Sequence, residues 1–189
     1  MANQDSPFGL RAIGKIGQNR DNQGLAEFSI AASATAIYGQ DPVKAAATGT
    51  IEVAAAGDTL LGSLNGVFFT AADTSKPTFA NHLNASNTAT DIVGFVSSDP
   101  YERFEIQSDN TTASAQTDVF MNYDITYAAG SSHDYLSGVE LDDSTTSTAS
   151  GQLRVVGVSK DIKNNDLTAS HVNFVVMINE HFLKGTAGI

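Results

Sequence analysis

The sequence lacks cysteine and tryptophan and is poor in cations. Without cysteine, disulfides, a thiolate nucleophile and a zinc-thiolate site are excluded. The 189 residues include 10 Lys and Arg against 21 Asp and Glu, giving a formal net charge of -11. Because nucleic-acid binding requires clustered cations, we expect no nucleic-acid partner. No apolar run approaches the roughly 20 residues that span a bilayer, and the start at Met1 lacks the features of a secretory signal, so we expect no membrane partner.

Sequence motifs for catalysis and cofactor binding are also missing. There is no Gly-x-Ser-x-Gly turn and no glycine-rich phosphate loop. No two of the histidines have the spacing of zinc ligands, and Asp142-Asp143 is not followed by the glycine and glutamate of a calcium loop. The four histidines are His82, His133, His171 and His181. We therefore expect no enzyme, no catalytic residue, no cofactor and no metal site within one chain, while a homo-oligomer could still gather one histidine from each subunit around its axis.

Residues 1–24 differ in charge from the remainder of the chain. They contain three cations and two carboxylates, whereas no Lys or Arg occurs between Arg103 and Arg154. Large apolar residues alternate here with glycines that weaken helix and strand alike. A frayed terminus is one interpretation. We favour an extended N-terminal arm over 1–24 that orders on a partner, and the expected anchors are Phe8, Leu10, Arg11, Ile13 and Ile16.

From residue 25 onward the hydrophobic period is two. In residues 119–127 every odd position is apolar, and Asn122, Asp124 and Thr126 occupy the other face, as in a half-buried strand. Turn sequences such as Asn65-Gly66 separate the candidate strands. The pattern predicts an all-β fold, a β-barrel or β-sandwich formed by one domain over 25–189. No internal repeat is visible.

The order of several short motifs resembles that of small virion structural proteins of tailed bacteriophages, of the capsid decoration or cement type. The resemblance spans roughly residues 5 to 181, and its joint order is more specific than any single motif. The motifs are Asp5-Ser6-Pro7-Phe8-Gly9-Leu10-Arg11, Asp41-Pro42-Val43, Asp99-Pro100, Phe104-Glu105-Ile106-Gln107, Gly138-Val139-Glu140-Leu141, Leu153-Arg154-Val155-Val156-Gly157-Val158 and Val175-Val176-Met177-Ile178-Asn179-Glu180-His181.

This resemblance implies a protein made in the host cytoplasm and bound to the outer capsid surface of the virion. Its expected partners are the major capsid protein and copies of itself, with a homotrimer favoured over a dimer. Two alternatives remain open: a tail, collar or head-fibre component of the virion, and a carbohydrate-binding β-sandwich. The lack of tryptophan argues against the second alternative, because such modules usually present exposed aromatic side chains.

Overall fold

A computed structural model describes residues 3–16, 24–109 and 114–185. The fold is all-β, with 42% of residues in strands and 3% in helices, and it contains two antiparallel sheets of six strands each. The expected fold class is therefore confirmed. In the described residues, no helix has the length and apolar character needed to cross a membrane.

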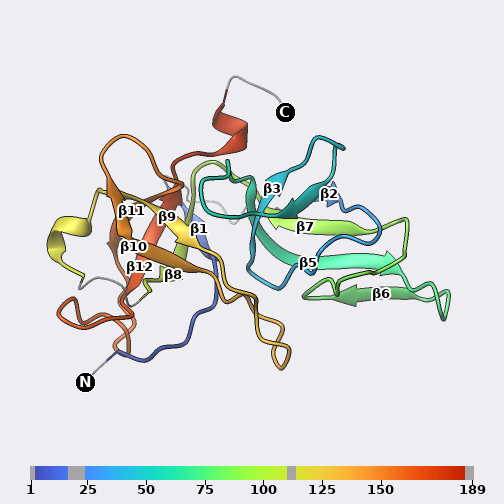
Figure 1. The fold of residues 1–189 in the computed structure, drawn as a ribbon, viewed down its shortest axis with the longest axis horizontal. Coiled ribbons are helices and arrows are strands. Elements are labelled where there is room, and N and C mark those ends of the chain that lie inside the picture. The colour runs from blue at the N-terminus through green and yellow to red at the C-terminus, as the bar shows by residue number, and fades with distance from the viewer. Residues whose placement is uncertain (1–2, 17–23, 110–113, 186–189) are drawn as a thin grey trace.

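The two sheets lie side by side as two lobes (Figure 1). The first sheet has the order β2 (Ala26–Ser29), β7 (Val93–Ser97), β5 (Gly62–Thr70), β3 (Pro42–Ala45) and β4 (Ile51–Val53), and β6 (Pro77–Ala80) pairs with β5 outside this path. The second sheet has the order β1 (Arg11–Lys15), β8 (Glu102–Gln107), β12 (Asn173–Ile178), β11 (Leu153–Val158), β9 (Asn122–Thr126) and β10 (Glu140–Ser147). Two 3-10 helices, η1 (Gln116–Asp118) and η2 (Phe182–Lys184), complete the described elements.

Each sheet curls until its ends meet. A parallel bridge between Ile30 and Ile51 joins the end of β2 to β4, and a parallel bridge between Ser108 and Leu141 joins the end of β8 to β10. Two five-stranded barrels result, which we call the N-barrel (β2, β3, β4, β5 and β7) and the C-barrel (β8 to β12). Strands β1 and β6 lie outside these closed paths.

The two barrels have the same strand order. If the five strands of each are counted along the chain, both run first, fifth, fourth, second, third. The hydrogen bonds repeat too. The amide of Ile30 donates to the carbonyl of Ile92 at 3.0 Å, and the amide of Ser108 donates to the carbonyl of Val172 at 2.8 Å. The chain thus contains an internal structural repeat, the five-stranded barrel, although no repeat is visible in the sequence.

The register of the central strands repeats in the same way. Leu64 faces Val96 in the N-barrel, and Val155 faces Val176 in the C-barrel. Directly after each of these pairs the register shifts by a bulge, which ends at Gly66 in one barrel and at Gly157 in the other. A bulge bends its strand and increases its twist, as closure of a small barrel requires.

Each barrel has its own apolar interior, formed by the alternate positions that the sequence pattern indicated. The C-barrel core contains Phe104, Ile106, Tyr123, Ile125, Leu141, Leu153, Val155, Phe174, Val176 and Ile178 among others. The N-barrel core contains Ile30, Ile37, Val43, Ile51, Leu61, Leu64, Val67, Leu83, Ile92 and Val96 among others.

The barrels are joined by contacts in both directions. Leu60, from the N-barrel side, belongs to the C-barrel core and forms a bridge with His181. The buried amide of Gln152 donates to the carbonyl oxygens of Ala55 at 2.9 Å and Asp58 at 2.7 Å.

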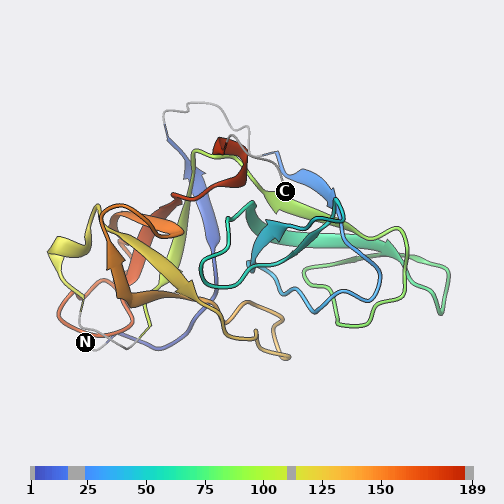
Figure 2. The same cartoon turned by 45° about the horizontal axis from the view of Figure 1, so that its top comes forward.

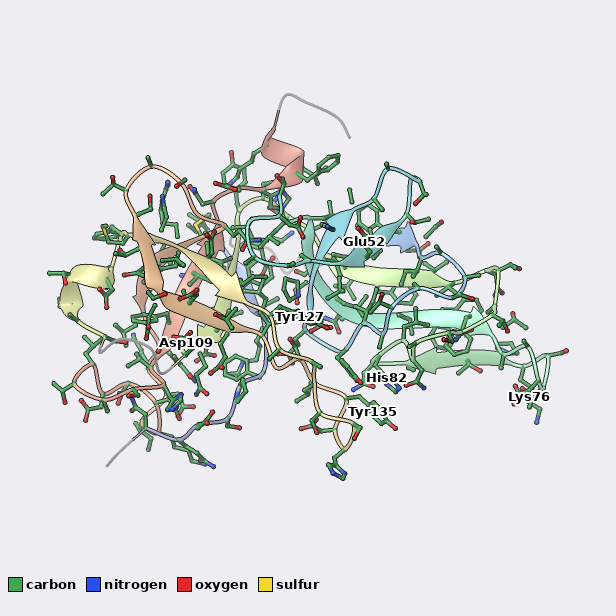
Figure 3. All side chains as sticks on the ribbon, in the orientation of Figure 1. Glu52, Lys76, His82, Asp109, Tyr127 and Tyr135 are labelled. Atoms are coloured by element: carbon green, nitrogen blue, oxygen red, sulfur yellow. The ribbon has the colours of Figure 1, made fainter. Side chains whose placement is uncertain are left out.

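Aromatic side chains fasten the junction at another point. The rings of His82 and Tyr135, one from each lobe, stack with centroids 3.7 Å apart (Figure 3). The loop that carries Tyr135 also bridges to the N-barrel side through Leu136 and Gly39. The region expected as one domain, residues 25–189, therefore contains two barrels that these contacts join.

Candidate functional site

The described part of the expected arm lies on the body. Asn3 donates its side-chain amide to the carbonyls of Asp166 at 2.9 Å and Ser170 at 2.8 Å. The carbonyl of Gln4 accepts from Gln107 at 3.0 Å and from Asn164 at 2.7 Å. These contacts tie the first described residues to the C-barrel. Residues 17–23, which complete the expected arm, lie outside the described residues.

Gly9 and Leu10 pass between the two barrels. Gly9 has a φ of +75°, and a Cβ there would lie 2.4 Å from the carbonyl oxygen of Gln40 and 2.5 Å from Cβ of Ser137. Only glycine therefore fits this passage. Leu10 is fully buried in the C-barrel core, and its amide donates to Gln40 at 2.9 Å. The expectation that Leu10 is an exposed anchor is corrected, because its apolar surface is already covered by the body.

Arg11 is also engaged within the chain. Its guanidinium pairs with the carboxylate of Glu105, whose side chain is only 8% exposed, and it lies 4.5 Å from the ring centroid of Phe8. Lys15 pairs with Asp99 at 2.7 Å. Arg11 and Lys15 thus pair with carboxylates of their own body. Arg11 and the half-buried Phe8 consequently offer less to a partner than the sequence indicated.

Ile13 and Ile16 are the two expected apolar anchors whose side chains are exposed. The side chains are 43% and 50% exposed, and they lie on or directly after β1. Figure 2 shows β1 running beside β8 at the junction of the two lobes. β1 is the last strand of its sheet, so among the described strands its outer edge has no neighbour. A bulge between Ala12 and Gly14 interrupts its pairing with β8.

Exposed apolar side chains on and after β1 are followed by one on the loop between β7 and β8. The amide of Ile16 donates to the carbonyl of Tyr101, whose side chain is 61% exposed. We call Ile13, Ile16 and Tyr101 the β1 edge. A cavity of about 290 Å³ lies beside the same strand, and its lining includes Leu10, Ala12, Gln40, Asn65, Asn81 and Leu136. The side-chain oxygen of Gln40 is buried without a hydrogen-bond partner.

A second cluster combines carboxylates with a histidine. Asp5, Glu140 and His171 come from distant parts of the sequence, and the structure brings their side chains together at the end of the C-barrel. Burial, together with the negative charges of Asp5, Asp109 and Asp143, raises the pKa of Glu140 to about 7. No local spacing in the sequence connects these three residues, so their grouping could not be predicted from it.

A third feature is an aromatic row on the N-barrel. The ring of Phe79, on the outlying strand β6, lies 4.8 Å from that of Phe68 on β5 and 6.5 Å from that of Phe95 on β7. Phe79 is 73% exposed. The polar composition of residues 73–90 indicated a long loop there, whereas Phe79 lies on β6, so the sequence did not reveal that these rings share one face.

A comparison of the chain with protein-family models, curated proteins and solved structures finds no match.

Proposed function

We propose that the chain is a capsid decoration protein, which binds the outer surface of an assembled phage head through its β1 edge. The observation that carries this proposal is that β1 is an edge strand among the described strands, with Ile13 and Ile16 exposed on it and directly after it. An extended segment of the major capsid protein can pair with such an edge through main-chain hydrogen bonds, while apolar side chains add contact area. This β1 edge takes the place of the free arm expected from the sequence.

Several copies of one weak contact can together give stable binding to the capsid. We propose a homotrimer, in which three β1 edges bind one local symmetry axis of the shell, so that the second and third contacts form at high effective concentration. Binding to the assembled shell alone stabilises that shell by mass action. The net charge of -11 keeps decorated particles apart through electrostatic repulsion. Light scattering coupled to gel filtration tests the trimer, which requires three times the 19.8 kDa protomer mass.

The decisive experiment compares two variants of matched chemistry. Ile13→Asp/Ile16→Asp places charges on the β1 edge, whereas Ile162→Asp places one at an exposed isoleucine elsewhere, which is 78% exposed. Each folded variant is sedimented with shells of the phage that encodes the chain. The proposal requires that the double variant lose binding by at least about tenfold, the equivalent of 1.4 kcal/mol. Equal binding of the double variant and the wild type would contradict it.

The position in the virion is tested separately by copy number. Quantitative mass spectrometry of purified virions should give a ratio to the major capsid protein near that of the shell subunits. A ratio of a few per cent would instead support a tail, collar or head-fibre component. Absence from the virion would overturn both assignments.

The aromatic row supports one alternative of another class, a carbohydrate-binding protein. Exposed rings stack on the apolar faces of sugars, and Phe79 is the most accessible ring of the row. A glycan array probed with wild type and with Phe79→Ala tests this function. Binding that the variant loses would favour it, and signals at background would exclude it.

A further inference from the structure

Three segments meet at one end of the C-barrel. Asp5 comes from the N-terminal segment, Glu140 is the first residue of β10, and His171 precedes β12. Nδ1 of His171 lies 3.9 Å from Oδ1 of Asp5 and 4.0 Å from Oε1 of Glu140. One ligand atom from each residue lies within 4.8 Å of the other two. The three groups thus face a common centre.

Two of these atoms have unmet hydrogen-bonding capacity. Oε1 of Glu140 and Nδ1 of His171 are both buried, and neither has a hydrogen-bond partner. A buried polar atom without a partner is costly, and two that face each other at 4.0 Å indicate a missing shared ligand. Asp109 and Asp143 add negative charge around Glu140, so the ligand that this environment favours is a cation.

The backbone holds the three groups in place. The carbonyl of His171 accepts a hydrogen bond from the side-chain amide of Asn164 at 2.8 Å. The backbone of His171 is left-handed, with a φ of +59°. Ser6 follows Asp5 directly in the chain, and its backbone amide donates to the side-chain oxygen of Gln107 at 2.8 Å. The side chain of Asp5 is 67% exposed, so it is free to adjust and open to ions from solvent.

We propose that Asp5, Glu140 and His171 form a binding site for a divalent transition-metal cation, with Zn²⁺ as the representative ion. Imidazole nitrogen suits Zn²⁺ and related metals, whereas Ca²⁺ and Mg²⁺ prefer ligands that are all oxygen. Ligands about 2.1 Å from a tetrahedral Zn²⁺ lie roughly 3.4 Å from one another. The observed separations, 3.9 and 4.0 Å for His171 and at most 4.8 Å between Asp5 and Glu140, exceed that spacing, so binding of the cation requires the three side chains to move closer together.

The site has a structural consequence that does not depend on the proposed function. Asp5 belongs to the segment that leads to β1, while Glu140 and His171 belong to the C-barrel. A bound cation therefore fastens the N-terminal segment to the barrel, in addition to the hydrogen bonds of Asn3 and Gln4. Binding to the folded state alone also raises the free energy of unfolding, with the logarithm of ion concentration once that concentration exceeds the dissociation constant.

The test is calorimetric titration of the untagged full chain, freed of metal with a chelator, with ZnCl2, MnCl2 and CaCl2. We expect about one Zn²⁺ per chain and weak or no Ca²⁺ binding. Asp5→Asn and His171→Asn should each lower the Zn²⁺ affinity by at least about tenfold. Both replacements preserve the fold, since Asp5 is exposed and asparagine tolerates the left-handed backbone of His171. His133→Asn, at an exposed histidine outside the cluster, is the matched control and should bind as the wild type does.

Hydrogen exchange gives a second readout. Zn²⁺ should slow the exchange of the amides of residues 3–6 in the wild type but not in Asp5→Asn. The proposal is overturned if the wild type takes up no Zn²⁺, if it prefers Ca²⁺, or if Asp5→Asn/Glu140→Gln/His171→Asn binds Zn²⁺ as tightly as the wild type. Circular dichroism of each variant establishes that the comparison is made between folded proteins.

Discussion

The backbone oxygen of Leu10 accepts a hydrogen bond from the hydroxyl of Ser63, and the bond is buried. Leu10 belongs to the segment that leads into β1 of the second sheet, whereas Ser63 lies on β5 of the N-barrel. The side chain of Leu10 meanwhile fills the C-barrel core. One residue of the N-terminal segment therefore contacts both barrels. This part of the segment is packed within the fold, whereas the sequence indicated an arm that extends from it.

Truncation of Leu10 should destabilise the whole protein. Leu10→Ala removes a fully buried side chain and leaves a cavity, which should lower the free energy of unfolding by about 3 kcal/mol. Ile13→Ala, at the half-exposed neighbour, should lower it by less than about 1 kcal/mol. Urea unfolding measures both. Equal losses for the two variants would mean that the segment is not packed in the core. Deletion of residues 1–20 should for the same reason destabilise the body as well as remove β1.

Gly94 and Phe174 occupy the same position of the two barrels, since Gly94 lies two residues before Val96 and Phe174 two residues before Val176, the valines that the shared register matches. A Cβ on Gly94 would lie 3.0 Å from methyl groups of Ile30 and Ile51. Gly94→Val should overpack the N-barrel and cost about 1–3 kcal/mol. Phe174→Ala should instead leave a cavity in the C-barrel and cost about 3–5 kcal/mol. Thermal unfolding of both variants checks this, and a stabilised Gly94→Val would refute the packing described.

Arg11 should stabilise the fold by pairing with Glu105. Arg11→Met leaves the largely buried carboxylate without its cation, and we expect a loss of about 2 kcal/mol, reduced from a fully buried pair because Arg11 is half exposed. Arg11→Met/Glu105→Gln should recover most of this loss, because no unpaired charge remains. Lys76→Met, at an exposed lysine, should change little. A double variant no more stable than Arg11→Met would contradict the pairing.

His181 should make stability depend on pH. Burial, with a smaller contribution from the charge of Lys184, lowers the pKa of His181 from 6.5 to about 4. Between these values the unfolded chain binds the proton and the folded chain does not. His181 therefore contributes fully to the free energy of unfolding above pH 6.5. This contribution is lost as pH falls to about 4, and its size is at most about 3 kcal/mol.

The check is the difference between the wild type and His181→Asn in unfolding free energy from pH 4 to pH 7. Asparagine can still accept the hydrogen bond that Nδ1 of His181 receives from the amide of Leu183. We expect the wild type to gain stability with pH relative to the variant across this window. Parallel pH curves for the two proteins would show that His181 does not titrate as described.

Local pattern was sufficient for the strands. The alternation around Tyr123 and Ile125 places both side chains in the C-barrel core, as expected. The same alternation could not reveal the repeat, because the two barrels share backbone register rather than side chains, as Gly94 and Phe174 show. A pattern of apolar and polar residues reports which face is buried, but it does not report which strands are neighbours.

The candidate sites show the same division. The sequence singled out five residues near the N-terminus, and of the four apolar ones only Ile13 and Ile16 are exposed. It could not foresee that Glu105 would bind Arg11, because the two are far apart in the chain. It missed the grouping of Asp5, Glu140 and His171 for the same reason.

The sequence by itself determined an acidic, cysteine-free chain whose period of two requires β-strands and buries one face of each. The tertiary structure alone decided that the strands close into two equivalent barrels, that Leu10 lies between them and that three distant polar side chains face one another. The physical reason is the range of the forces. Side-chain alternation acts between neighbouring residues, whereas barrel closure and ion pairing depend on distances that exist only after the chain has folded.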